Sequence, residues 1–206
     1  MNYERLLSFG DILELNIQCD PYKLLNETKP YKWLKYNPRK DIKRYGLSLT
    51  SLTGEIDGID LDSIYEYNRV NNVNLDETSF TELTDIYYNS SEVRKIMDPW
   101  VDTGLGRSHI IHLPPGGHFP PHRDLSHFEE DQKTFRVIVP LINCNPEQAY
   151  FMYEDKPLHF KHGKSYFMNT NKMHSVFSMS DCYLIVLNVF YNDDNVKEIL
   201  SNLAYN

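Results

Sequence analysis

The sequence has few cysteines and no long apolar run. Its 206 residues include only three cysteines, Cys19, Cys144 and Cys182, and none of them forms a CxxC pair. This excludes a disulfide framework and a zinc–thiolate site of the usual spacing. The longest apolar run, Cys182 to Leu187, is far too short to cross a bilayer, and the first residues do not resemble a signal peptide. We therefore expect a cytoplasmic protein without membrane contacts.

The chain also lacks a basic excess, because its formal net charge is -8. Nucleic acids and membrane surfaces are anionic, so this charge argues against both as partners. Residues 29–45 are a local exception, in which lysines and arginines are interleaved with aromatic residues. Such a run is usually a solvated surface, but it can also steer an acidic substrate or stack on single-stranded nucleic acid. Within it, Arg39 and Arg44 are candidates for binding a substrate carboxylate.

The N-terminal part of the chain, residues 1–104, is expected to be helix-rich and to pack on the rest. The pattern of apolar residues predicts a strand over 13–19, a helix over 21–27 capped by Asp20, a strand near 47–52, and helices around 61–65 and 93–97. The last of these helices is expected to end before Pro99. At the other end, residues 193–206 predict one amphipathic helix that begins near Asp193 or Asp194.

Residues 105–192 have a different character. Short strand-like runs follow one another, separated by turn formers such as Pro-Pro-Gly-Gly and Asn-Cys-Asn-Pro. The runs are Arg107–Leu113, Thr134–Ile142, Ala149–Tyr153, Leu158–Phe160, Ser165–Met168, His174–Phe177 and Cys182–Phe190. Many short strands with such punctuation are typical of a sandwich or barrel of antiparallel sheets. The sequence therefore predicts a single, mainly β domain with flanking helices.

A His-x-Asp pair lies at the start of this β-rich part. His122 and Asp124 are two residues apart, so in an extended strand both side chains point to the same side. His174 follows on a later predicted strand. Two imidazoles and one carboxylate are the set that holds non-haem Fe(II) and leaves the opposite face open. The pair alone is weak evidence, since an exposed polar loop carries the same pattern by chance.

Arg136 stands alone among apolar residues in the strand that follows the pair. A buried arginine must be paired, so this one either faces solvent on an edge strand or grips a carboxylate with its planar fork. Phe119 and Phe128 are candidate walls of a pocket, although core packing is the commoner role of such residues.

The ordered set of motifs resembles a known family. It comprises HLPPGG at 112–117, PHRD at 121–124, RVIVPL at 136–141 and GKSYFMN at 163–169, followed by His174. The stretch from Arg107 to Phe190 is similar to the core of the Fe(II)/2-oxoglutarate-dependent oxygenases. Within them it most resembles the aspartyl/asparaginyl β-hydroxylase family, which includes bacterial proline 3-hydroxylases. The first hundred residues show no such resemblance.

The resemblance implies a double-stranded β-helix core of the jelly-roll or cupin-like kind over residues 105–192. It implies that His122, Asp124 and His174 bind Fe(II), and that no further side chain is catalytic. With O2 and 2-oxoglutarate as cosubstrates, the enzyme would hydroxylate an amino-acid side chain and release succinate and CO2. The substrate would be a free amino acid or an Asp, Asn or Pro residue of a peptide or protein.

One position departs from the family. An arginine that binds the far carboxylate of 2-oxoglutarate usually stands ten residues after the second histidine, where this chain has Leu184. Arg136 is the first candidate to replace it, and Arg107 and His109 are second choices. The departure keeps two alternatives open: an iron-dependent oxygenase that does not use 2-oxoglutarate, and a cupin-like protein that binds a ligand without turnover.

Overall fold

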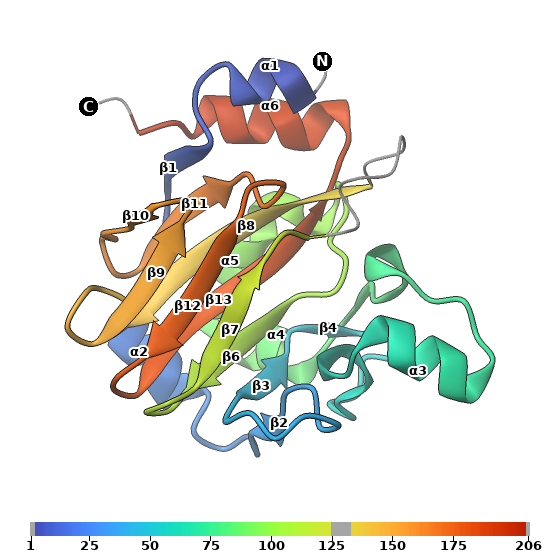
Figure 1. Ribbon diagram of the computed structural model, residues 1–206. Helices are drawn as coiled ribbons and strands as arrows, with labels where there is room; N and C mark the ends of the chain where they lie inside the picture. Colours follow the sequence, from blue (N-terminus) through green and yellow to red (C-terminus); the bar gives the residue numbers. More distant parts are fainter. Residues whose placement is uncertain (1–2, 125–132, 205–206) are drawn as a thin grey trace.

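The computed structural model describes residues 3–124 and 133–204 (Figure 1). Its elements are α1 (Tyr3–Leu7), β1 (Ile12–Gln18), α2 (Pro21–Glu27), β2 (Leu34–Lys35), β3 (Tyr45–Ser48), β4 (Thr50–Ser51), η1 (Ile59–Leu61), α3 (Ile64–Asn71), η2 (Glu77–Ser79), β5 (Glu82–Leu83), α4 (Asp85–Asn89), α5 (Ser91–Val101), β6 (His109–Leu113), β7 (His118–His122), β8 (Thr134–Ile142), β9 (Ala149–Tyr153), β10 (Lys156–Pro157), β11 (Lys164–Met168), β12 (His174–Ser178), β13 (Cys182–Phe190) and α6 (Asp193–Ser201).

Two antiparallel sheets form the centre of the molecule. The larger sheet has the strand order β1-β11-β8-β13-β6-β3-β2, and the smaller has the order β10-β9-β12-β7. From β6 onward, successive strands pass from the larger sheet to the smaller and back, with β9 and β10 both in the smaller. This alternation rolls the chain into a double-stranded β-helix. The predicted mainly β fold with this core is confirmed.

The larger sheet is buried on both faces because its central strands carry apolar residues at nearly every position. In β13, Ile185, Leu187 and Val189 belong to the core that the helices cover, whereas Leu184 and Val186 face the space between the sheets. Neighbouring residues of a strand point to opposite faces, so one continuous apolar run supplies both cores.

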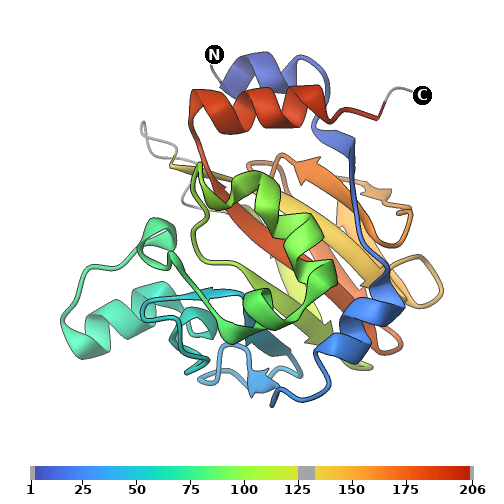
Figure 2. The same ribbon diagram turned by 180° about the vertical axis from the view of Figure 1, so that it is seen from behind.

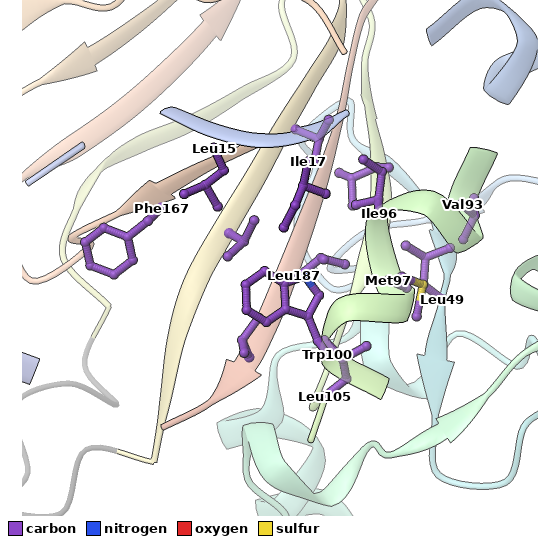
Figure 3. Packing of buried hydrophobic residues seen from close by; sticks show 14 of the residues in the cluster. Leu15, Ile17, Leu49, Val93, Ile96, Met97, Trp100, Leu105, Phe167 and Leu187 are labelled. Atoms are coloured by element: carbon purple, nitrogen blue, oxygen red, sulfur yellow. The ribbon is translucent and has the colours of Figure 1, made fainter. Parts of the chain in front are cut away.

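Helices cover the outer face of the larger sheet. In Figure 2, α2, α4 and α5 lie across that face, and α1 lies beside α6 at one end. Trp100 of α5 is fully buried and meets Phe135 of β8 edge-on. Figure 3 shows Trp100 beside Leu187, with Met97 and Ile96 of the same helix pointing into this core. The N-terminal part is more than a helical layer, because β1, β2 and β3 extend the larger sheet.

Several sequence-based boundaries need correction. Helix α5 does not end before Pro99 but runs on to Val101, with Pro99 inside it. Proline removes one backbone hydrogen bond, but the buried side chains on either side of it, Met97 and Trp100, hold the last turn against the sheet.

At the C-terminus the cap of α6 is Asn192, whose side chain accepts from the Asn195 N–H, and the two expected aspartates lie in the first turn. The expected strand at Leu158–Phe160 is replaced by a short one at Lys156–Pro157. The expected cap of α2 is confirmed, since the Asp20 carboxylate accepts from two backbone N–H groups. None of the helices in the described part of the chain has the length and apolar character that a membrane span requires.

Candidate metal centre

The His-x-Asp pair and the distant histidine meet at one end of the smaller sheet. His122 is the last residue of β7, His174 is the first of β12, and the two residues are direct partners in the ladder between these strands. Asp124 follows two residues later, where its backbone N–H donates to the Thr170 carbonyl at 3.1 Å. One ligand atom of each of His122, Asp124 and His174 lies within 4.8 Å of the other two. The three side chains thus converge as the sequence predicts.

The hydrogen bonds of the two imidazoles suit them to bind a metal. Nδ1 of His122 lies 2.7 Å from the Pro120 carbonyl oxygen, and Nδ1 of His174 lies 2.9 Å from the Lys172 carbonyl oxygen. A carbonyl can only accept, so each Nδ1 carries the proton and each Nε2 presents a lone pair. Nε2 of His122 lies 3.8 Å from Oδ1 of Asp124. Two imidazole nitrogens and one carboxylate fit a divalent ion such as Fe(II).

Arg136 supports the carboxylate of this set. It lies at the start of β8 and is almost completely buried, which excludes the solvent-facing alternative. Its Nε donates to Oδ2 of Asp124 at 3.0 Å, and its Nη2 lies 3.7 Å from Oε1 of Glu77. Burial by itself lowers the pKa of Arg136, but the two carboxylates outweigh this effect and raise it. Its Nη1 is buried and has no hydrogen-bond partner among residues 3–124 and 133–204.

Arg107 and His109 lie close to the same centre but differ in how they are bound. Arg107 donates to Glu77 at 3.1 Å and to the carbonyl oxygens of Asp60 and Asp62. His109 is buried, and its Nδ1 lacks a partner in the described part of the chain. Burial, with the nearby charges of Arg107 and Arg136, holds the pKa of His109 well below its usual value. The ring is therefore neutral at pH 7.

A cavity of about 130 Å³ lies between the two sheets. The three converging side chains line it, together with Arg107, His109 and Arg136. Its polar lining consists of Tyr36, Arg107, His109, His122, Asp124, Arg136, Thr170, His174, Ser175 and Asn188. Its apolar lining includes Ile111, Phe119, Ile138, Phe151, Leu158, Met168, Val176, Leu184 and Val186.

Strand register separates these two groups. Asn188 of β13 pairs with Arg136, and two residues back along β13, Val186 pairs with Ile138 and His109. Two further back, Leu184 pairs with Pro140 and Ile111. At about 3.3 Å per residue, Leu184 lies roughly 13 Å along the strand from Asn188. The polar groups therefore gather at the end of the cavity that holds His122, Asp124 and His174, which we call the triad. Leu184 lies at the opposite, apolar end of the cavity.

A wider groove of about 490 Å³ opens beside the cavity. Tyr36, Phe119 and His122 line both spaces. Of the predicted substrate-binding residues, Arg44 lines the groove and Phe119 lines both spaces. Arg39 is not among the lining residues of either space; it forms an ion pair at 2.9 Å with Asp62, which does line the groove. Phe128 lies outside the described residues.

Sequence reasoning missed Glu77, Asn188 and Tyr36. Glu77 accepts from Arg107 and from the Asn188 amide, which donates at 2.7 Å, so it neutralises the arginines beside the triad. Asn188 was detectable, since it is a lone polar residue in an apolar strand, as Arg136 is in β8. Nothing in the sequence around Glu77 or Tyr36 indicates that they reach this centre.

No family model matches the sequence, and no curated protein matches it. Solved structures match at low similarity. A prolyl hydroxylase from Trichoplax adhaerens, in complex with a hypoxia inducible factor peptide fragment, is 14% identical; the match covers 96% of this chain and 90% of that one, with a TM-score of 0.48. A 2OG-Fe(II) oxygenase family oxidoreductase from Burkholderia pseudomallei is 11% identical over 82% and 76%, with a TM-score of 0.44.

A predicted oxalate decarboxylase from Thermotoga maritima is 17% identical; the match covers 42% of this chain and 68% of that one, with a TM-score of 0.33. At these identities and TM-scores, none of the three bears on the activity of this chain.

Proposed function

We propose that this chain is an Fe(II)- and 2-oxoglutarate-dependent dioxygenase that hydroxylates an amino-acid side chain and releases succinate and CO2. One observation carries the proposal: one ligand atom of each of His122, Asp124 and His174 converges, and Nδ1 of both imidazoles is held by a backbone carbonyl. His122, Asp124 and His174 would hold the iron. When bound, the iron supplies the oxygen activation that protein side chains cannot perform.

Unpartnered polar atoms in the cavity support an anionic cosubstrate. Arg136 Nη1, His109 Nδ1 and Thr170 Oγ1 are buried and have no partner within the described ranges, and all three residues line the cavity. Buried polar atoms without partners are rare in folded proteins and point to a ligand that satisfies them. In this proposal Nη1 of Arg136 donates to a carboxylate of 2-oxoglutarate. The apolar lining around Ile138 keeps water away from the reacting groups.

A second candidate is an iron-dependent oxygenase that does not use 2-oxoglutarate. The apolar end of the cavity favours it, because Leu184, Ile111 and Ile138 offer no charge to the far carboxylate of a five-carbon diacid. In that case Arg136 and His109 would bind a monocarboxylate or the substrate itself.

Anaerobic titration with Fe(II), with and without 2-oxoglutarate, separates the possibilities. A visible charge-transfer band that needs both components supports the first proposal. Iron binding that is indifferent to 2-oxoglutarate supports the second candidate. Absence of iron binding refutes both and leaves a cupin-like protein that binds a ligand without turnover.

A further inference from the structure

Arg44 is a buried cation that has no ion-pair partner in the part of the chain that the structure describes. It precedes β3, and only 4% of its surface is exposed. Among residues 3–124 and 133–204, no carboxylate lies within ion-pair distance of its guanidinium, and its Nε has no hydrogen-bond partner. Arg107 and Arg136, by contrast, both reach carboxylates. An unpaired buried charge is strongly unfavourable, so its presence calls for a ligand.

Arg44 lines the groove, and its guanidinium lies against two aromatic rings. Its Cζ lies 4.3 Å from the centre of the Phe119 ring and 5.4 Å from that of Tyr36. A guanidinium stacked on aromatic rings keeps the N–H groups of its edge for a planar acceptor. Phe119 also lines the cavity of the metal centre. A molecule bound at Arg44 therefore lies in a space that leads directly to the triad.

An unpartnered acceptor lines the same groove as this donor. The backbone N–H of Tyr36 donates to the Arg44 carbonyl at 2.8 Å, so the chain segments that carry Asn37 and Arg44 run together. Oδ1 of Asn37 is buried and has no partner among the described residues, and Asn37 lines the same groove. A guanidinium and an amide oxygen that line one groove match the carboxylate and the amino group of an α-amino acid.

We propose that Arg44 binds the free carboxylate of the substrate and Asn37 its amino group, so that the substrate is a free α-amino acid and not a residue within a peptide. This inference rests on the proposed oxygenase function. The groove volume of about 490 Å³ suits a small molecule. A carboxylate fits better than a phosphate, because Arg107 and Arg136 are already paired with carboxylates and Arg44 alone among these buried cations has a charge to match.

The test measures succinate release with the standard L-α-amino acids as probes, in the presence of Fe(II), 2-oxoglutarate and ascorbate. For each amino acid that raises the rate, its carboxamide and a short peptide containing the same residue are compared. We expect the carboxamide to lose about 10- to 100-fold in kcat/KM, since it loses a charge-assisted hydrogen bond. This comparison uses the unaltered protein and needs no folded variant.

Variants then assign the effect to Arg44. Arg44→Gln is expected to raise KM for the amino acid about 10- to 100-fold and to remove most of the preference for the acid over its amide. Arg44→Lys keeps the charge but loses the planar pair of donors, so its KM should lie between those of the unaltered protein and Arg44→Gln. Lys35→Gln removes an exposed cation that lines neither space, and should match the unaltered protein.

The outcomes separate this inference from the function on which it rests. If Fe(II) and 2-oxoglutarate give no charge-transfer band, the proposed function fails; calorimetry with the same amino acids then tests Arg44 directly. If the band forms but carboxamides or peptides react as well as the acids, the role of Arg44 is refuted. It is also refuted if none of the amino acids is bound or turned over, or if Arg44→Gln leaves KM unchanged.

Discussion

Replacing Glu77 by glutamine tests whether its negative charge stabilises the protein by balancing the buried charges of Arg107 and Arg136 beside the triad. Glu77 lies 3.1 Å from Arg107 and 3.7 Å from Arg136, and both guanidinium groups are buried. Glutamine has nearly the same shape and retains an oxygen that accepts from Arg107. The substitution removes the negative charge and the hydrogen bond from Asn188, because the new amide NH2 cannot accept, while packing changes little. Of the two buried arginines, Arg136 keeps its ion pair with Asp124.

The expected effect is large for an isosteric change. Breaking a buried ion pair by removing one partner typically destabilises a protein by about 3–5 kcal/mol. Because the glutamine oxygen keeps one hydrogen bond, we place Glu77→Gln at the lower end, about 3 kcal/mol. For a chain of this length each kcal/mol shifts Tm by about 2–4 °C, so Tm should fall by about 6–12 °C.

Urea and thermal unfolding of the metal-free protein measure this effect. Lys133→Gln is the matched control, because Lys133 forms an exposed ion pair with Asp76 at 2.8 Å immediately before β8. Such surface pairs contribute about 0–1 kcal/mol. If Glu77→Gln changes the free energy of unfolding no more than the control does, the charge of Glu77 does not stabilise the fold around the two arginines, and the prediction is wrong.

Further predictions concern the ligands, the pH dependence and the core. His174→Ala should abolish turnover and Fe(II) binding in equilibrium dialysis, whereas exposed His159→Ala should bind iron normally; retained binding in His174→Ala would remove that residue from the ligand set. Burial opposes ionisation of Glu92, but hydrogen bonds from two lysines and a backbone N–H outweigh it and hold its pKa at about 2. A lowered pKa stabilises the fold above the usual carboxyl pKa of 4.5 and loses this contribution as pH falls toward 2; Glu92→Gln should therefore flatten the stability profile between these values, and an unchanged slope would contradict the assignment. Phe167→Ala, at a fully buried site, should lower the free energy of unfolding by about 3–5 kcal/mol in urea titrations. Exposed Phe9→Ala should stay within about 0.5 kcal/mol, and equal losses would refute the packing in Figure 3.

Local patterns were sufficient to predict much of this protein. Strand β13 is an apolar run interrupted by Asn188, and a strand buried on both faces needs apolar residues at nearly every position. Asp20 and Pro21 predict the start of α2 because capping depends on neighbouring residues alone. The spacing of His122 and Asp124 predicts a shared face, since alternation along an extended chain is a local property. Arg136 was detectable for a related reason, as a charge that no apolar strand tolerates unpaired.

The tertiary structure decided everything that depends on distant segments. His174 meets His122 only because β12 pairs with β7 in one register, and a slip of one residue would turn its side chain to the other face. Glu77 reaches the arginines beside the metal centre from the N-terminal part, where no local pattern marks it. The basic run 29–45 indicated Arg39 and Arg44 alike, and only the tertiary structure shows that Arg44 and not Arg39 lines the groove. Helix α5 continues through Pro99 because buried neighbours outweigh one lost hydrogen bond. Local sequence sets which residue types are present, but the free energy of packing distant segments together decides which of them share a site.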